Sequence, residues 1–140
     1  MTRLRFGIVL AAGLAAWSAE AGAETLYDDL GGRPGLTRIT SDCIDLAMAD
    51  KRIATVFDNS DIPKLKANLH DQLCMLTGGG CAYKGKEMSK SHAPLHLTNA
   101  DFNALVEDLQ TAMDRAKVPY RVQNRLLAIL APMQRDIVTR

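Results

Sequence analysis

The sequence predicts an all-α domain of four main helices, with shorter helical pieces between them. Apolar residues recur at spacings of three and four along almost the whole chain, and no stretch shows sustained alternation of apolar and polar residues. Glycines and prolines separate these periodic segments, as expected at the ends of helices. A four-helix bundle is the usual arrangement for such a chain. However, the non-helical stretch from Gly78 to Met88 is long for so small a domain, and such segments usually serve a functional site.

The N-terminus has the three parts of a secretory signal peptide. Met1–Arg5 contains two arginines, Phe6–Trp17 is an almost unbroken apolar run, and Ala21-Gly22-Ala23 offers the small residues that a signal peptidase requires. An uncleaved membrane anchor is the alternative, but a spanning helix needs about 20 apolar residues, and Ser18-Ala19-Glu20 interrupts the run too early. We therefore expect residues 1–23 to be removed and the remaining chain to be exported to the periplasm.

Residues 24–140 have the length of a single domain. Once the leader's two arginines and one glutamate are removed, the 17 basic and 16 acidic residues become 15 of each, so the formal charge is zero. Proteins that bind nucleic acid or anionic membranes usually carry an excess of basic residues, so neither is an expected partner of the mature domain. Phe57, Phe102 and three tyrosines are its only aromatic residues. A core so poor in aromatic side chains must be filled by aliphatic ones or by a group from outside.

The first two helices are delimited by glycine and proline. A short helix over Leu26–Leu30 ends at Gly31-Gly32, and Pro34 suits the first turn of a second helix that should stop near Ala49-Asp50. The buried face predicted for this second helix consists of Leu36, Ile39, Cys43 and Leu46 or Ala47.

The third helix and a short one after it follow from similar signals. Asn59-Ser60-Asp61 is rich in residues that start helices, so the third helix should begin near Ile62, and Gly78-Gly79-Gly80 ends it. Met88–His92 can form only one or two turns, because Pro94 disfavours continuation. The apolar stripe of the third helix is Ile62, Leu65, Leu69, Leu73 and Leu76.

Two longer helices complete the domain. Thr98-Asn99 with Asp101 predicts the start of one, Val118-Pro119 breaks it, and the last helix should run from Tyr120 to Ile137. The inner faces of these helices are predicted to be Phe102, Leu105, Val106, Leu109 and Met113 in the first, and Val122, Leu126, Ile129 or Leu130, Met133 and Ile137 in the second.

An ordered set of residues along the whole domain resembles the group I truncated haemoglobins, whose fold is a two-over-two sandwich of helices around haem. The resemblance extends from Leu26 to about Val138. It rests on Leu26-Tyr27-Asp28-Asp29-Leu30-Gly31-Gly32, Phe57, Gly78-Gly79, Tyr83, Gly85, Met88, His92 and, ten residues later, Phe102. Each glycine pair alone is weak, but the complete set in this order and spacing is specific.

This resemblance implies a haem site in which His92 is the proximal iron ligand. It also implies that Phe57 wedges the haem and that Tyr83 lies near the propionates. A neutral imidazole on a short, rigid segment is a good ligand for haem iron. The motif Cys-x-x-Cys-His is absent from the sequence, so the expected cofactor is a non-covalently held haem b. The pocket-wall positions implied by the resemblance are Met88, Phe102 and Val106.

The gas-binding side of the expected pocket departs from the family pattern. The resemblance places Ile44, Leu65 and Leu69 there, at positions where the family usually has tyrosine and often glutamine or threonine, which hydrogen-bond to oxygen. All three are apolar in this sequence. We expect an apolar pocket that releases oxygen quickly, with carbon monoxide and nitric oxide binding less affected.

Three further polar residues leave alternatives open. Asn68 and His70 flank the Leu65 and Leu69 stripe, and either could turn inward as a donor or sixth ligand, although exposed positions on the helix edge are the simpler interpretation. His96 follows Pro94 and is expected at the surface, or as an alternative iron ligand.

The cysteines also allow more than one interpretation. In an exported protein, Cys74 and Cys81 are a plausible disulfide across the glycine turn, with Cys43 left over. Free thiols are the first alternative. A second is a zinc site, because His70, Cys74 and Cys81 have suitable types and spacing, with Cys43 as a possible fourth ligand.

The expected function is reversible binding of a diatomic gas, O2, NO or CO, at haem iron trans to His92. Nitric oxide oxidation or a peroxidase-like reaction is implied for some family members, but no general acid or base is evident beside the iron, and no reductase partner is indicated. Two alternatives come from other classes. One is a periplasmic haem protein for electron transfer or haem carriage. The other is a haem-free helical interaction domain braced by a disulfide.

Overall fold

The computed structural model describes residues 22–140, and the predicted leader lies almost entirely outside this range. Within it the chain is helical, and the only pairing of β type is an isolated bridge between Leu97 and Val138. The all-α prediction is confirmed. In chain order the elements are α1 (Leu26–Asp29), α2 (Gly32–Ala49), the 3₁₀ turn η1 (Ala54–Phe57), α3 (Ile62–Thr77), α4 (Met88–His92), η2 (Ala93–Leu95), α5 (Asn99–Arg115), α6 (Tyr120–Leu130), η3 (Ala131–Met133) and α7 (Gln134–Ile137).

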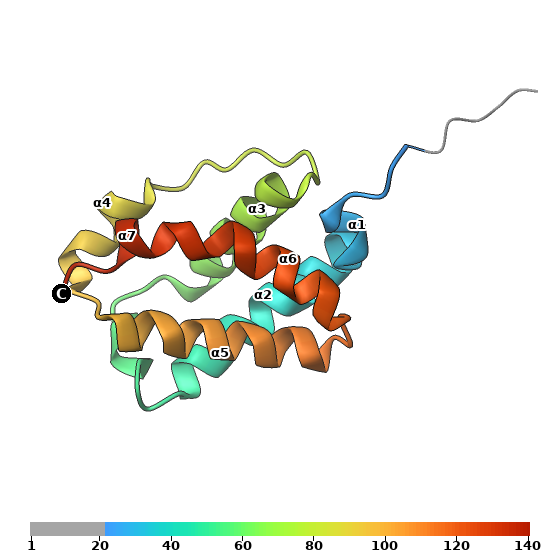
Figure 1. Cartoon of the computed structure of the whole chain (residues 1–140). Coiled ribbons are helices and arrows are strands. Elements are labelled where there is room, and N and C mark those ends of the chain that lie inside the picture. The colour runs from blue at the N-terminus through green and yellow to red at the C-terminus, as the bar shows by residue number, and fades with distance from the viewer. Residues whose placement is uncertain (1–21) are drawn as a thin grey trace, which may run out of the picture.

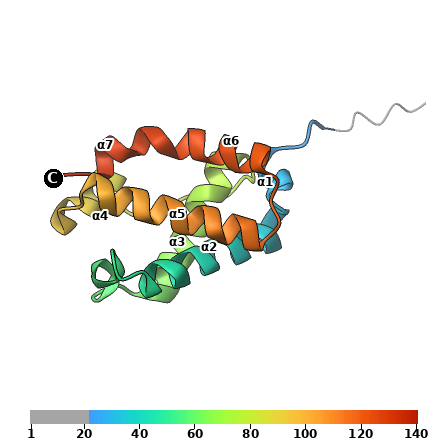
Figure 2. The ribbon, with the colours of Figure 1, turned by 60° about the horizontal axis from the view of Figure 1, so that its bottom comes forward.

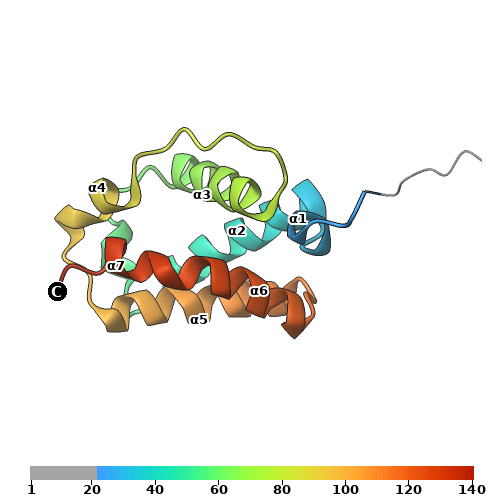
Figure 3. The same ribbon diagram turned by 45° about the horizontal axis from the view of Figure 1, so that its top comes forward.

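The four main helices are α2, α3, α5 and α6, and they pack as the pair α2 and α3 against the pair α5 and α6. α2 packs against both α3 and α5, and α5 packs against α6. Figure 1 shows α5 and α6 running antiparallel, and Figure 3 shows α3 on the opposite side of α6 from α5. α2 passes behind α5 in the view of Figure 2. The irregular chain between α3 and α4 runs along the outside of α3, so the long non-helical segment expected from the sequence is present.

Helix starts follow the predicted capping residues. The side chain of Asp61 accepts a hydrogen bond from the backbone N–H of Lys64 at 3.1 Å and begins α3. Thr98 and Asp101 form a reciprocal capping box at the start of α5. Gly78 ends α3 with φ of 91°, a left-handed conformation that favours glycine. These short-range contacts explain why the boundaries could be predicted.

The final helix differs from the prediction. Instead of one helix over residues 120–137, α6 ends at Leu130, and a 3₁₀ turn separates it from α7. Pro132 lies within this turn. Proline has no N–H to donate, and its ring clashes with the carbonyl of the residue four positions earlier, so it interrupts the α-helical ladder.

No helix within residues 22–140 has both the length and the apolar character required to cross a membrane.

Candidate functional site

Burial differs between the two ends of the helical sandwich. Near α1 the inner side chains are almost completely enclosed, and they include Leu30, Leu36, Ile39, Leu73, Met113 and Leu126. Near α4, at the other end in Figure 1, the inner stripes of the same helices are only partly buried. These residues are Leu65, Leu69, Phe102, Val106, Leu127 and Leu130. The α4 end therefore keeps apolar surface that a bound apolar group would remove from water.

A hollow lies within this half-buried region. It has a volume of about 240 Å³ and is lined by Phe102, Asn103, Val106, Leu127, Leu130, Ala131 and Gln134 of α5, α6 and η3. Pockets for cofactors and other small molecules typically measure about 300 to 1,000 Å³. A larger cofactor would therefore extend beyond this hollow and over the half-buried side chains around it.

His92 is oriented by its own short helix. Its Nδ1 lies 2.7 Å from the backbone oxygen of Met88, one turn earlier in α4. A carbonyl oxygen can only accept, so Nδ1 carries the proton, and the neutral ring keeps its lone pair on Nε2. Metal-bound imidazoles commonly have this arrangement, in which a hydrogen bond from the second nitrogen fixes the tautomer and the ring orientation. Nε2 of His92 can therefore bind iron.

The C-terminus supports the segment that carries His92. α4 packs against α7, and the two lie side by side in Figures 1 and 3. Just after η2, the carbonyl oxygen of Leu97 accepts hydrogen bonds from the N–H groups of Thr139 at 3.0 Å and Arg140 at 3.2 Å. This contact between distant parts of the chain is not visible in the local sequence pattern. Tertiary contacts with the C-terminal segment thus stabilise α4, which has only five residues.

The other expected cofactor-binding residues occupy several elements. Ile44 is buried in α2 with 3% of its surface exposed, and Met88 is half-buried at the start of α4. Phe57 packs at the edge of the cluster formed by Ala47, Ile53 and Ala104. Leu65, Leu69, Phe102 and Val106 belong to the half-buried α4 end described above.

Tyr83 forms a turn within the irregular segment before α4. Its hydroxyl donates to the carbonyl oxygen of Lys86 at 2.7 Å, and burial raises the pKa of the phenol. The ring lies so close to Gly85 that an added Cβ would be 2.3 Å from the Tyr83 oxygen. The Tyr83 and Gly85 pair in the sequence thus corresponds to a packed turn that leads towards His92.

The other two histidines differ in their exposure to solvent. His96 is exposed and has a left-handed φ of 50°, as the surface interpretation predicts. His70 is 7% exposed, so its expected position on an exposed helix edge is wrong. It is buried because it faces α2, where it lines a hollow with Thr37 and Ser41. Asn68 is half-buried.

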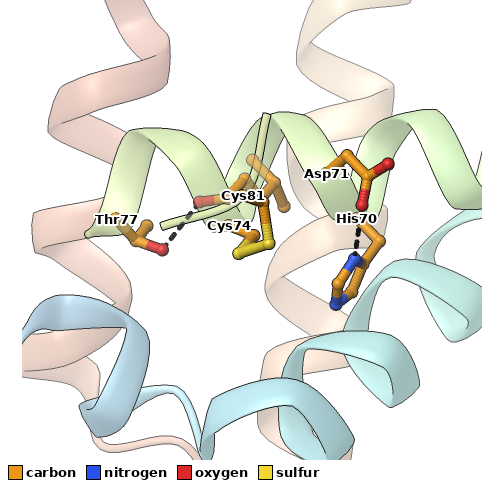
Figure 4. The surroundings of a disulfide bond; sticks show 6 residues. His70, Asp71, Cys74, Thr77 and Cys81 are labelled. Carbon is orange, nitrogen blue, oxygen red and sulfur yellow. Dashed lines mark hydrogen bonds and ion pairs between the residues drawn. A yellow bond between two sulfur atoms is a disulfide. The ribbon is translucent and has the colours of Figure 1, made fainter. Parts of the chain in front are cut away.

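The cysteines also separate into two environments. Cys74 and Cys81 are joined by a disulfide whose Cα atoms are 5.5 Å apart, and the bond connects the last turns of α3 to the irregular segment (Figure 4). Cys43 is a buried free thiol on α2. Burial, and next the negative charge of Asp108, raise the pKa of Cys43 to about 12. This thiol is therefore protonated and unreactive at neutral pH.

Loss of the disulfide should reduce stability. The bond closes a short loop with a sequence separation of 7, and loop-closure entropy gives it a value of about 2 to 3 kcal/mol. We expect Cys81→Ser to lower the free energy of unfolding by that amount under oxidising conditions, as measured by urea denaturation. With a reductant present, the variant and the parent chain should differ little. An equal difference under both conditions would show that the serine itself, and not the lost bond, causes the effect.

Asp108 is a buried carboxyl that sequence reasoning did not single out. It is 9% exposed, and its Oδ2 has no hydrogen-bond partner within residues 22–140. Burial, followed by the negative charge of Asp50, raises the pKa of Asp108. Asp108 lies four residues from both Ala104 and Ala112, which are buried on the same face of α5, but only the structure shows that this face is enclosed.

This carboxyl should make stability depend on pH. Because its pKa is higher in the folded chain than in the unfolded one, the folded state binds more protons between the two values, and stability falls as pH rises through that window. We expect Asp108→Asn to be more stable than the parent chain at pH 7. The advantage should shrink as pH falls to about 4, near the ordinary pKa of aspartate. Urea denaturation across this range measures it, and a difference independent of pH would contradict the assignment.

Comparison with known proteins agrees with this fold. The model of the family described as bacterial-like globin matches residues 25–139, so the chain belongs to this family. Group 1 truncated haemoglobin from Tetrahymena pyriformis is 29% identical over 115 residues, which cover 82% of this chain and 95% of that protein. The corresponding protein of Nostoc commune is 32% identical over 89 residues, which cover 64% of this chain and 75% of that protein.

Solved structures show the same architecture. The crystal structure of the Tetrahymena pyriformis truncated haemoglobin in its Fe(III) form superposes with a TM-score of 0.80 at 28% identity, covering 84% of this chain and all of that one. The 2/2 haemoglobin of a Synechococcus species gives a TM-score of 0.78 at 24% identity, covering 84% of this chain and all of that one, which supports the fold. The predicted two-over-two globin fold is confirmed, and haem with its iron is the cofactor that this family implies.

Proposed function

We propose that the chain binds a diatomic gas, O2, NO or CO, at the iron of a haem b held by Nε2 of His92. The observation that carries this proposal is the hydrogen bond from Nδ1 of His92 to the carbonyl oxygen of Met88, which leaves Nε2 available as a ligand. When bound, haem would supply an iron that can bind a gas molecule. The general function of the family, haem-based gas binding, supports the assignment.

The half-buried apolar side chains would enclose the porphyrin. Met88, Phe102 and Val106 offer apolar surface at the α4 end, and Phe57 adds an aromatic edge. Each of these side chains would contribute about 25 cal/mol to the free energy of haem binding for every Å² of its apolar surface that the cofactor covers. Tyr83, which precedes α4, is our candidate for the region of the propionates. We propose that the haem is held without a covalent bond to the protein, because the sequence lacks a Cys-x-x-Cys-His motif.

The gas side of this pocket consists of apolar side chains. Ile44, Leu65 and Leu69 offer neither a hydrogen-bond donor nor an ionisable group. Oxygen would therefore be held without a stabilising hydrogen bond and released quickly, and an acid or base for an enzymatic step is not supplied by these three residues. Gas binding is favoured over catalysis for this reason.

We also propose that the protein acts outside the cytoplasm, in the periplasm. The arginines and apolar run in residues 1–23 support a cleaved leader. The Cys74–Cys81 pair is consistent with an oxidising compartment, where a disulfide would persist.

An absorption spectrum tests the proposed function. The purified protein, supplied with haem and reduced, should show a Soret band that shifts when carbon monoxide is added. A low-spin spectrum that carbon monoxide does not change would instead favour electron transfer or haem carriage. No Soret band after haem is supplied would favour the haem-free interaction domain. A reductase or other redox partner is not part of the proposal.

A further inference from the structure

His70 is a buried histidine with one unused nitrogen. Its side chain is 9% exposed, and Nε2 has no hydrogen-bond partner within residues 22–140. Nδ1 lies 3.1 Å from Oδ1 of Asp71, as the dashed line in Figure 4 shows. Because a carboxylate accepts, Nδ1 donates in this pair and the lone pair of the neutral ring lies on Nε2. A buried acceptor without a partner is costly, so Nε2 is available for a ligand that would remove this cost.

Sulfur lies next to this histidine. One ligand atom each of His70, Asp71 and Cys81 lie within 4.8 Å of one another, and Cys81 is bonded to Cys74, which is in the same helix as His70 and one turn after it. Figure 4 shows the imidazole and the two sulfur atoms on the same side of α3. Cys43 is not a member of this group. Imidazole nitrogen and thiolate sulfur are the ligands that zinc prefers in proteins.

We propose that reduction of the Cys74–Cys81 disulfide uncovers a zinc site formed by Nε2 of His70 and the thiolates of Cys74 and Cys81, with water in the fourth position. Asp71 is a positioning residue, because its carboxylate orients the imidazole through Nδ1, as second-shell carboxylates do in zinc proteins. This site is separate from His92 and does not depend on the proposed haem function.

In an oxidising compartment the disulfide form prevails, so the zinc form requires an external two-electron reductant, a dithiol, to act on the protein. The dithiol is oxidised to a disulfide while the S–S bond of Cys74 and Cys81 breaks and each sulfur gains a proton as a thiol. Zinc then binds the two sulfurs and His70, and the two thiol protons pass to solvent. In the oxidised chain neither sulfur is a thiolate, so the same zinc ion has too few ligands. The disulfide and the metal are therefore alternative states of the same pair of cysteines.

The local geometry permits this change. Zinc binds sulfur at about 2.3 Å and imidazole nitrogen at about 2.0 to 2.1 Å, so its ligand atoms lie about 3.5 Å apart. A ligand atom of His70 and the sulfur of Cys81 lie within 4.8 Å of each other and must come closer, whereas the sulfurs of Cys74 and Cys81, which are bonded, must move apart. Cys81 belongs to a segment without regular structure and can move more easily than Cys74 within α3. A hollow of about 330 Å³ between α2 and α3, lined in part by His70 and Asp71, offers an approach from solvent.

Equilibrium dialysis of the haem-loaded protein against zinc tests the proposal. After reduction with a metal-free phosphine, we expect one tightly held zinc ion per chain, and none in the oxidised protein. X-ray absorption at the zinc edge should show two sulfur neighbours near 2.3 Å. The Soret band should be the same with and without zinc, because the haem iron is not involved. Equal zinc retention by the reduced and oxidised protein would overturn the proposal.

Matched variants identify the ligands. We expect His70→Gln and Cys81→Ser to weaken zinc binding by more than about 100-fold, and Asp71→Asn to weaken it by about 10- to 100-fold, the usual effect of losing a second-shell partner. The controls His96→Gln and Cys43→Ala should keep the parent affinity, because His96 is exposed on another segment and Cys43 is a buried thiol on α2 that takes no part in the disulfide. Circular dichroism of each variant checks that it is folded. Zinc binding that survives His70→Gln in a folded chain would overturn the proposal.

Discussion

Replacement of His92 by glycine should remove the only protein ligand that we assign to the iron. The substitution deletes the imidazole, together with its hydrogen bond to the carbonyl oxygen of Met88. Haem would then be retained by apolar contacts alone. We expect the Soret band of the parent protein to be lost or strongly altered, and haem transfer to an acceptor protein to be more than tenfold faster. Absorption spectroscopy and the rate of haem transfer measure these two effects.

Addition of free imidazole to the His92→Gly variant separates ligand loss from misfolding. Imidazole that enters the vacated space should restore a spectrum close to that of the parent protein. His96→Gly is the matched control, because His96 is exposed and its removal should leave the spectrum unchanged. A parent-like spectrum in His92→Gly without added imidazole would show that another residue binds the iron, and would contradict the central assignment.

Introduction of a hydrogen-bond donor on the gas side should have the second large effect. Leu65→Gln places an amide of similar size on the inner stripe of α3, at a half-buried position that can accommodate it. A hydrogen bond to a partly charged ligand contributes about 1.5 to 3 kcal/mol. We therefore expect oxygen dissociation to slow by roughly ten- to hundredfold. Flash photolysis or stopped-flow mixing with the reduced protein measures this rate.

Carbon monoxide supplies the comparison for this variant. It carries less charge than oxygen when it is bound, so its dissociation should change much less in Leu65→Gln. Leu65→Met is the control for altered packing, because it keeps an apolar side chain of similar volume. If both variants slow oxygen release equally, the effect comes from packing, and the proposed absence of a donor in the parent pocket is wrong.

Much of the fold is predictable because its signals are local. The capping residues Asp61 and Thr98 act on N–H groups three residues away, and Gly78 adopts the backbone conformation that ends α3. Helical spacing of apolar residues indicated the inward face of α2 correctly. In α3 it was less accurate, because only Leu73 of the predicted stripe is buried and the other buried residues are His70, Cys74 and Thr77. The break at Pro132 was local too, and it was missed because the apolar stripe continues through it. The set of residues resembling the globin family predicted the haem cofactor, which the family match supports.

The members of the candidate site were proposed from the sequence, but their surroundings were not. His92, Leu65 and Phe102 were chosen from the resemblance to the family, and their roles as ligand and pocket residues remain predictions. The motif did not reveal that Nδ1 of His92 contacts Met88 or that the chain end supports Leu97. These contacts depend on backbone geometry and on residues about 40 positions apart.

The sequence by itself determined the helical segments, their caps and the class of cofactor, since these follow from periodicity, short-range hydrogen bonds and an ordered motif. Only the tertiary structure decided how deeply each side chain is buried. His70 and Asp108 are polar residues on helices, and the sequence could not show that α2 covers one and the protein interior encloses the other. It also could not show that the stripes are enclosed near α1 but half-buried near α4. Burial depends on which other helix lies opposite, and that is a property of the packed molecule.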